Sequence, residues 1–407
     1  MSLHLKFVII GSQRNRRIQF WQDALKRCGL PEARLVDYSD LIDGKESLEN
    51  LLDSQTIARF ESPEKNFMLE QAIIAAGANL ETAGTHQKIS AVDALKLEFD
   101  KGRIYYPRQW YLGWRQLLHQ WGNFGTNYGE WIKNTSGNGQ AWMMNHPEDI
   151  IQMFDKRICH DLFTNSHLMG NIVRKSGKQS CQTEIPIPRS LGKINSYDQL
   201  REQMQLQNYN RVFVKLAHGS AASGVVAYRI SSKGESAITT VERVRENGKT
   251  ILYNSRKIRN YMQREEIADI INILCKEGVQ VEEWLPKAKL HNRPFDLRVV
   301  AINGEARHTV VRLGKSPMTN LHLGSDRLPG EAFFQKVGDE NWQAMKQTCE
   351  AAAALFPNSL YCGIDLLVYP DFRRHAILEI NAFGDLLPGM TWQNMDTYTS
   401  EVKAILQ

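Results

Sequence analysis

The sequence predicts an α/β unit followed by an α+β unit, because an early strand–helix–strand pattern gives way to hairpin turns. An apolar run at 5–10, a helical pattern over 18–28 and a second apolar run at 33–38 fall within the first 40 residues. This order of elements forms a βαβ unit, whose strands are parallel. Further along, Asn-Gly pairs at 247–248 and 303–304 mark tight turns between antiparallel strands.

The rest of the first 147 residues is expected to contain two helices and a long segment rich in loops. Helical patterns cover 46–54 and 66–76, whereas residues 100–147 hold five of the nine tryptophans, mixed with glycine, asparagine and arginine. We expect these rings to pack a loop-rich region onto the sheet. The alternative is a substrate cleft in this segment, with Arg108 as an anchor for an anion.

The second part of the chain alternates between helical and extended patterns. Helices are expected over 149–163, 198–207, 262–276, 342–356 and at the C-terminus, and strands over 211–215, 225–230, 239–245, 250–255, 279–285, 295–302, 306–313, 363–369 and 375–380.

The composition is that of a soluble globular protein of two or three domains. The chain has 407 residues, 42% of them hydrophobic and 23% charged, which excludes disorder, collagen and simple coiled coil. No apolar run approaches a membrane span of about 18 residues or a signal-peptide core of about seven, so we expect a cytoplasmic protein without a membrane partner. The six cysteines form no C-x-x-C pair, so no structural zinc is expected. A net charge of +5 is too mild for nucleic-acid binding but suits anionic ligands.

Three oxygen-bearing side chains near the C-terminus could bind a metal ion. Glu379 and Asn381 are two residues apart in an apolar strand and so share a face, with Leu378 and Ile380 turned to the core. Asp365 lies in the preceding apolar strand, and a hairpin would bring it alongside. Two half-buried carboxylates and an amide oxygen suit Mg²⁺ shared with phosphates. The alternative is that both acids are solvated.

A lysine and a run of small residues form the second pattern. Lys215 ends a strand, and the loop that follows could hold phosphate oxygens with its backbone amides. The loop consists of His218, Gly219, Ser220, Ala221, Ala222, Ser223 and Gly224. It does not match the P-loop motif, and an ordinary hairpin is the alternative.

Two further segments could contact a nucleotide. The strand end Glu282, Glu283, Trp284 and Leu285 could offer backbone groups to an adenine ring, although an ordinary strand end fits equally well. Arg298 and Arg312 lie on expected neighbouring strands and could hold phosphate or carboxylate oxygens, with surface salt bridges as the alternative.

In this order, these segments resemble the ATP-grasp superfamily of ligases over roughly residues 150–395. The spacing looks closest to the ribosomal-protein glutamylase and glutathione-synthetase branch, and D-alanine–D-alanine ligase is a more distant parallel. The chain also looks like a bacterial ATP-grasp subgroup with segments such as FVKLAHGSAASGVV and LEINAFGDLLPG. The resemblance implies an N-terminal Rossmann-like (pre-ATP-grasp) domain at 1–147. An ATP-grasp fold of two α+β subdomains would follow, at 148–284 and 285–407.

The resemblance also implies roles for individual residues. The phosphates of ATP would contact Lys156, Lys215 and the loop residues His218, Gly219, Ser220, Ser223 and Gly224. The adenine pocket would use Glu282, Glu283, Trp284 and Leu285; Mg²⁺ would bind Asp365, Glu379 and Asn381; and Arg298 and Arg312 would neutralise the transferred phosphoryl group. Where relatives often have a ribose-binding acid, this chain has Lys287, and Asp296 is an alternative. Substrate contacts would come from Arg16, Arg17, Arg108, Trp110 and Trp114.

The implied reaction is the ATP- and Mg²⁺-dependent ligation of a carboxylate to an amine or a thiol through an acyl phosphate. The carboxylate and the amine could be small molecules or peptides, and a homodimer is an option because relatives often pair. Two alternatives remain open: a small-molecule kinase of the same superfamily, and a non-catalytic nucleotide-binding protein within a larger complex.

Overall fold

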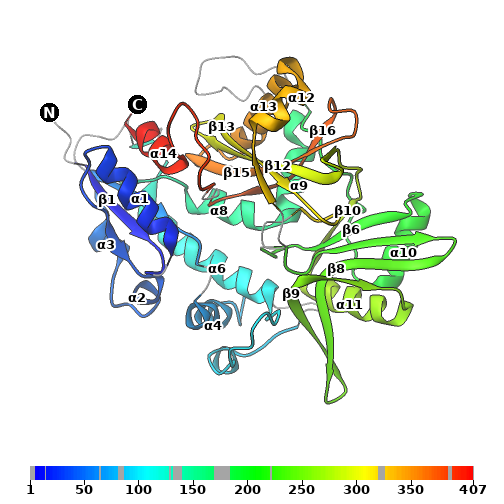
Figure 1. Ribbon diagram of the computed structural model, residues 1–407. Coiled ribbons are helices and arrows are strands. Elements are labelled where there is room, and N and C mark those ends of the chain that lie inside the picture. Colours follow the sequence, from blue (N-terminus) through cyan, green and yellow to red (C-terminus); the bar gives the residue numbers. More distant parts are fainter. Residues whose placement is uncertain are drawn as a thin grey trace.

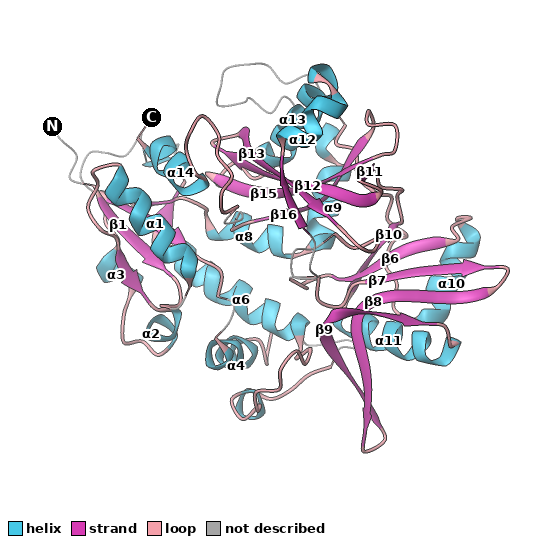
Figure 2. Cartoon of the chain, in the orientation of Figure 1, coloured by secondary structure: helices cyan, strands magenta, loops and turns pink. Residues whose placement is uncertain are grey.

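The described residues form three β-sheets and the helices that cover them (Figures 1 and 2). The computed structural model describes residues 5–13, 15–63, 66–80, 87–127, 130–131, 140–168, 184–220, 222–319, 326–383 and 387–406. Its helices are α1 Arg16–Arg27, α2 Tyr38–Ile42, α3 Leu48–Leu51, α4 Phe67–Ala76, α5 Ala91–Ala94, α6 Pro107–Gly122, α8 Pro147–Phe154, α9 Lys156–Thr164, α10 Tyr197–Leu206, α11 Arg264–Glu277, α12 Glu331–Val337, α13 Asp339–Ala354 and α14 Thr397–Ile405. Within these ranges, no helix combines the length and the apolar character that a membrane span requires.

The N-terminal sheet is parallel in all its described pairings, which confirms the predicted βαβ unit. In spatial order its strands are β2 Arg34–Val36, β1 Lys6–Ile10, β3 Thr56–Phe60, β5 Ala141–Met143 and β4 Gly125–Thr126. Every residue of β3 is buried, as expected of an inner strand in a parallel sheet with both faces covered.

The prediction of a loop-rich segment over 100–147 is wrong for α6, a helix of 16 residues. Its internal glycine serves close packing instead of a turn. A Cβ atom on Gly113 would lie 1.9 Å from the carbonyl oxygen of Ile73, and one on Gly77 would lie 2.0 Å from that of Gln109. Only glycine therefore lets α4 and α6 approach this closely. The prediction that the rings pack is confirmed for four tryptophans, which are buried: Trp114, Trp121, Trp131 and Trp142.

The single helix predicted over 149–163 is also wrong, because the chain divides into α8 and α9 at Asp155. The backbone of Asp155 is extended, and its carboxylate accepts a hydrogen bond from the N–H of Arg157. Asp155 thus caps a new helix, as aspartate commonly does. The break places Lys156 in the first turn of α9.

The central sheet is antiparallel and has its own hydrophobic core. Its spatial order is β10 Val279–Glu283, β6 Arg211–Leu216, β7 Val226–Ser231, β8 Gly234–Glu246 and β9 Lys249–Tyr261. Helices α10 and α11 pack against it through apolar residues such as Leu200 and Ile270. The predicted turn at 247–248 is present between β8 and β9, and both its residues have positive φ.

The C-terminal sheet is also antiparallel. Its spatial order is β14 Asp326–Pro329, β13 Glu305–Leu313, β12 Arg293–Ile302, β15 Tyr361–Val368 and β16 His375–Asn381, with β11 Lys289–Leu290 paired to β12. This sheet shares its core with the N-terminal part of the chain: one cluster of buried side chains includes Tyr38, Trp114, Phe295 and Ile364. The N- and C-terminal parts therefore pack as one body, and the central sheet packs beside it (Figure 1).

A buried ionic cluster links the N-terminal sheet to α14. The guanidinium of Arg59 lies 2.6 Å from Glu61 and 2.5 Å from Glu401, and all three side chains are at most 2% exposed. The ring of Tyr361 lies 4.6 Å from the same guanidinium. One cation thus pairs with two buried carboxyl groups from distant parts of the chain.

The substitution Glu401→Gln is expected to remove a pH dependence of the free energy of unfolding. Burial of the carboxyl, only partly opposed by Arg59, raises the pKa of Glu401 to about 7. Between about pH 4.5 and pH 7 the unfolded chain loses this proton first, so rising pH favours unfolding. The free energy of unfolding of the native protein should therefore fall relative to Glu401→Gln, by up to about 3 kcal/mol. Urea titrations at pH 4.5 and pH 8 measure this difference; the exposed substitution Glu49→Gln is the control, and equal pH profiles for native and Glu401→Gln would refute it.

Candidate nucleotide and substrate site

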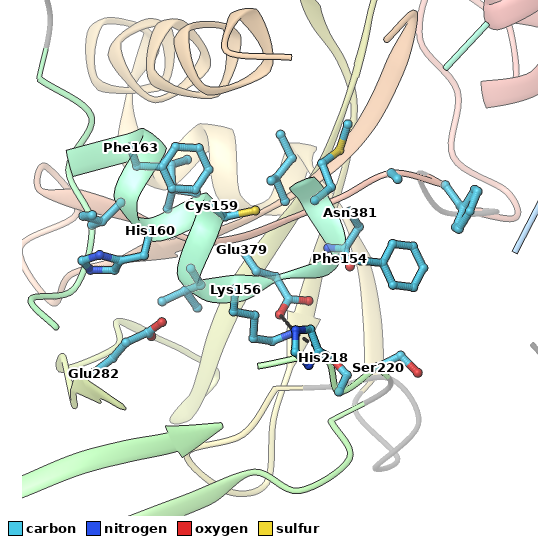
Figure 3. Close-up of a pocket in the computed structure, with 18 of the residues that line it drawn as sticks. Phe154, Lys156, Cys159, His160, Phe163, His218, Ser220, Glu282, Glu379 and Asn381 are labelled. Atoms are coloured by element: carbon cyan, nitrogen blue, oxygen red, sulfur yellow. Dashed lines mark hydrogen bonds and ion pairs between the residues drawn. The ribbon is translucent and has the colours of Figure 1, made fainter. Parts of the chain in front are cut away.

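The three predicted metal ligands lie together at one end of the β15–β16 hairpin. Asp365 pairs directly with Glu379, and Asn381 pairs with Gly363, two residues away. The amide of Asn381 donates to the carbonyl oxygen of Gly363 at 3.3 Å, which leaves its own oxygen as an acceptor. Figure 3 shows Glu379 and Asn381 beside Lys156.

A bulge in the same hairpin corrects one expectation. The register shifts between Asp365 and Leu366, so Leu378 is left without a partner in the register. Ile380 is buried in the core as predicted, but Leu378 packs in a small separate cluster with Leu285. The side chain of Leu378 therefore lies beside Glu379 at the wall of a cavity between the central and C-terminal sheets.

The two predicted arginines are buried against Asp365, so the surface alternative is wrong for both. Arg298 pairs with Asp365 in the β12–β15 register, with Nε 2.6 Å from Oδ1, and Arg312 Nη2 lies 2.8 Å from Oδ2. Their side chains are 11% and 5% exposed. Burial raises the pKa of Asp365, although both arginines oppose the shift.

Two lysines face the acids from other elements. Lys156 Nζ lies 3.5 Å from Glu379 and donates to the carbonyl oxygen of Gly219 at 2.8 Å. Burial opposes ionisation of Glu379, but nearby cations, first among them Lys156, outweigh it and lower its pKa to about 2. Lys215 Nζ lies 2.5 Å from Glu282, and this partner raises the pKa of Lys215 despite burial.

Lys287 and Asp296 form a further ion pair beside this cluster; the sequence relates both positions only to the ribose contact. Lys287 Nζ lies 3.0 Å from Asp296, which also accepts a bond from Arg312 at 2.8 Å. Thr319 bonds to both Asp296 and Lys287. Burial opposes ionisation of Asp296, but Arg312 and Lys287 outweigh it and lower its pKa. Asp296 does border the cavity, as the ribose alternative requires, but its carboxylate is already paired.

The glycine-rich loop divides into an anchored start and a turn. The ring of His218 stacks on Tyr111 at 3.9 Å, and its Nε2 lies 2.8 Å from Asp155. Burial lowers the pKa of His218 to about 4, although Asp155 opposes the shift. His218 is thus an anchor for the loop, contrary to the expected phosphate contact. Ser223 donates its N–H to Ser220 at 2.8 Å, and the tight turn continues into Gly224 at φ +66°.

The side chains of the strand end at 282–285 do not all face the same cavity. Glu282 and Leu285 are buried and border the cavity together with Glu283. The ring of Trp284 instead packs on Phe213, with centroids 5.2 Å apart, and lies outside the cavity lining. The expected role of Trp284 in the adenine pocket is therefore not supported.

The cavity between the central and C-terminal sheets, here called the nucleotide cavity, has an empty volume of about 820 Å³. Its lining includes Phe213, Lys215, Gly219, Glu282, Glu283, Leu285, Lys287, Asp296, Arg312, Thr319, Asp365, Leu367, Leu378 and Glu379.

A second cavity, here called the distal cavity, has an empty volume of about 870 Å³. It is lined by Arg17, Ser62, Met153, Phe154, Lys156, Cys159, His160, Phe163, Ile187, Pro188, His218, Gly219, Ser220, Glu282, Ile377, Leu378, Glu379, Ile380, Asn381, Ala382 and Phe383. The two cavities share Lys156 and Glu379, so they meet at this ion pair (Figure 3).

The predicted substrate residues fall in different places. Arg17 borders the distal cavity and donates to the carbonyl oxygen of Phe383 at 3.1 Å. Trp110 supports the cavity wall from behind by stacking on Phe154 at 5.9 Å. Trp114 is fully buried in the core, so its expected role is wrong. Neither Arg16 nor Arg108 borders the two cavities: Arg16 lies over the ring of Phe20, and the backbone N–H of Arg108 donates to Glu277.

The donor set fits a hard divalent cation. Asp365 and Glu379 offer carboxylate oxygens and Asn381 an amide oxygen, and the oxygens of Asp365 are at present paired with Arg298 and Arg312. Mg²⁺ typically binds one or two carboxylates and completes its shell with water and phosphate oxygens. No cluster of three or more His, Cys, Asp or Glu residues suited to a metal occurs in the described part of the chain, so a cage made only of protein acids is absent there.

Comparison with known proteins places this geometry in a family. A family model described as YheC/D-like ATP-grasp matches residues 178–366, which include Lys215 and Asp365. The match covers a little under half of the chain, and over this region it supports the ATP-grasp superfamily. No curated protein matches the sequence.

Solved structures similar to this chain share its fold over nearly the whole length. The ATP-grasp ligase PsnB complexed with a minimal precursor matches at 15% identity and a TM-score of 0.51, covering 99% of each chain. PsnB complexed with a minimal precursor, Mg and ADP matches at 14% identity and 0.51, covering 100% of this chain and 97% of PsnB. D-cycloserine synthetase DcsG matches at 12% identity and 0.51, covering 98% of each chain. At these identities the likeness establishes the fold.

Proposed function

We propose that this protein is an ATP-dependent ligase that joins a carboxylic acid to an amine, or to a thiol, and releases ADP and phosphate. The observation that carries this proposal is the convergence of Asp365, Glu379 and Asn381 with Lys156 and Lys215 where two cavities meet. An ATP-grasp fold with these residues in place has the parts that phosphoryl transfer to a carboxylate needs.

The three sheets support the division of the chain that the sequence predicts. We assign residues 1–147, with the parallel sheet, to a Rossmann-like pre-ATP-grasp domain. Residues 148–284 and 285–407, with one antiparallel sheet each, form the two ATP-grasp subdomains.

ATP would occupy the nucleotide cavity. The apolar side chains of Leu285, Leu367 and Leu378 form a cluster that suits an adenine ring, with the backbone at 283–285 beside it. Lys215 lies deeper, next to Glu282, and suits a phosphate oxygen. The triphosphate would then extend toward Lys156 and Glu379.

Asp365, Glu379 and Asn381 would hold Mg²⁺. Bound there, Mg²⁺ would supply positive charge that offsets the repulsion among the phosphate oxygens. Lys156 now contacts Glu379 and would turn to a phosphate oxygen when that carboxylate binds the cation. Arg298 and Arg312 are fixed by Asp365 and add charge near the transferred phosphoryl group, where preorganised cations stabilise the transition state.

The acid would bind in the distal cavity, on the other side of the Lys156–Glu379 pair. Its carboxylate attacks the terminal phosphorus of ATP and gives an acyl phosphate and ADP. An amine then attacks the acyl carbon and expels phosphate.

Trapping with hydroxylamine tests the ligase proposal. The purified chain with ATP, Mg²⁺ and a panel of carboxylic acids should form a hydroxamate and ADP in equal amounts, because hydroxylamine intercepts an acyl phosphate. Mass spectrometry and an ADP assay measure both products. A stable phosphorylated acid or alcohol without hydroxamate would indicate a kinase instead. Tight ATP binding without turnover on the whole panel would indicate a nucleotide-binding protein.

A further inference from the structure

About half of the residues that line the distal cavity are apolar, and several of them are deeply buried. Phe163, Ile377 and Ile380 are 3%, 1% and 2% exposed and belong to the main hydrophobic core. Unlike most core residues, they also border an empty cavity. A cavity with such walls favours an apolar occupant.

Aromatic rings on one side of the cavity are held in place from behind. Phe154 and Phe383 meet edge to face with centroids 5.7 Å apart. Trp110 stacks on the other side of Phe154 at 5.9 Å, and Trp114 stacks on Trp110 at 6.0 Å. The wall is therefore preformed, and Figure 3 shows Phe154 beside Asn381 at the edge of the metal site.

The sulfur in the cavity lining behaves as an apolar group. Cys159 is 5% exposed, and its thiol donates to the carbonyl oxygen of Gln152 at 3.2 Å. Burial raises the pKa of Cys159 well above its usual range. The thiol is thus neutral, and it extends the apolar wall beside Phe163.

The charged side chains named below, which line the described part of the distal cavity, already have partners, so they are poorly placed to bind a second anionic group. Lys156 and Glu379 form the pair at the junction with the nucleotide cavity. Arg17 bonds to the backbone of Phe383, and His160 Nε2 lies 3.0 Å from the carbonyl oxygen of Pro188. A second carboxylate beside Phe163 and Ile377 would lose its hydration among apolar side chains, and it would have to compete with the carbonyl oxygen of Phe383 for Arg17.

We propose that the acid activated by this enzyme is a monocarboxylic acid with an aliphatic or aromatic body. Its carboxylate lies at the junction beside Lys156, Glu379 and Asn381, and its body lies between the Phe154–Phe383 wall and the core residues behind Cys159. This inference rests on the proposed ligase function, and it adds the chemical class of the substrate.

Binding measurements test the substrate class separately from catalysis. Calorimetry with the full chain, Mg²⁺ and a non-hydrolysable ATP analogue should show 4-methylpentanoate and 3-phenylpropionate binding at least about 100-fold more tightly than glutarate, since glutarate must bury a second charge. Hydroxamate formation should follow the same order. Glutarate binding as tightly as, or more tightly than, the apolar acids would overturn the inference.

A substitution in the wall provides a second test. Phe154→Ala should raise the KM for 3-phenylpropionate by roughly 10–100-fold, because about one ring face of contact is lost. The KM for ATP should stay within about twofold, which also shows that the variant folds. The matched control is Phe99→Ala, since Phe99 is 71% exposed and lies outside both cavities. Equal KM values for the acid in native and Phe154→Ala protein would contradict the assigned cavity.

Failure of this inference differs from failure of the proposed function. If dicarboxylic or cationic acids form hydroxamates best, the ligase function stands and the substrate class is wrong. If no acid forms a hydroxamate or releases ADP, and neither apolar acid binds the nucleotide complex, both proposals are wrong.

Discussion

Glu379→Gln should lower substrate-dependent ADP release by at least about a thousandfold. Glu379 lines both cavities, and its low pKa keeps it ionised at neutral pH. Glutamine preserves the size of the side chain but removes the negative charge that would hold Mg²⁺ opposite Asp365. The negative charge of the triphosphate would then be less well neutralised, so the rate of phosphoryl transfer should fall more than the affinity for ATP.

Two measurements separate this effect from a loss of folding. Calorimetry should show that ATP binding to the native protein strengthens with Mg²⁺ and weakens with EDTA, whereas binding to Glu379→Gln responds little to either. The control Glu340→Gln changes an exposed residue of α13 and should keep native turnover. Full turnover in Glu379→Gln would reject the metal site and, with it, the proposed mechanism.

Arg59→Met should lower the free energy of unfolding by about 3–5 kcal/mol. The substitution leaves Glu61 and Glu401 buried without their cation. It also removes the charge that lies over the ring of Tyr361. Because Glu61 follows β3 and Glu401 belongs to α14, the loss should loosen the packing of the C-terminal helix on the N-terminal sheet.

Urea denaturation at pH 7 measures this loss, and a neighbouring ion pair supplies the control. Arg34 lies on β2 of the same sheet and pairs with Glu46, but its side chain is 56% exposed. Surface pairs contribute about 0–1 kcal/mol, so Arg34→Met should have a small effect. Similar losses of unfolding free energy in both variants would show that the buried Arg59 cluster stabilises the fold no more than a surface ion pair does.

The strand chemistry of the site could be predicted from the sequence. Alternation along a strand places Glu379 and Asn381 on one face whatever surrounds them, and the hairpin brings Asp365 opposite. The lysine before the small-residue loop, the strand end at 282–285 and the two arginines follow from local patterns in the same way. Most of these residues border the nucleotide cavity, whereas Asn381 borders the distal cavity and Arg298 supports Asp365 from outside both linings.

Other parts were misjudged because distant contacts decide them. Gly113 looks like a loop residue until α4 packs against it, and His218 looks like a phosphate ligand until Tyr111 and Asp155 enclose its ring. Leu378 was expected in the core, but a bulge moves it to the cavity. In each case the local pattern is compatible with two environments.

By itself, the sequence determined which residues carry oxygen, charge and small side chains, and which of them share a strand face, because the backbone period depends only on local geometry. The tertiary structure alone decided which apolar residues are packed solid and which border empty space. Phe154, Phe163 and Ile380 are all apolar, and only their contacts with residues far away along the chain make them border a cavity.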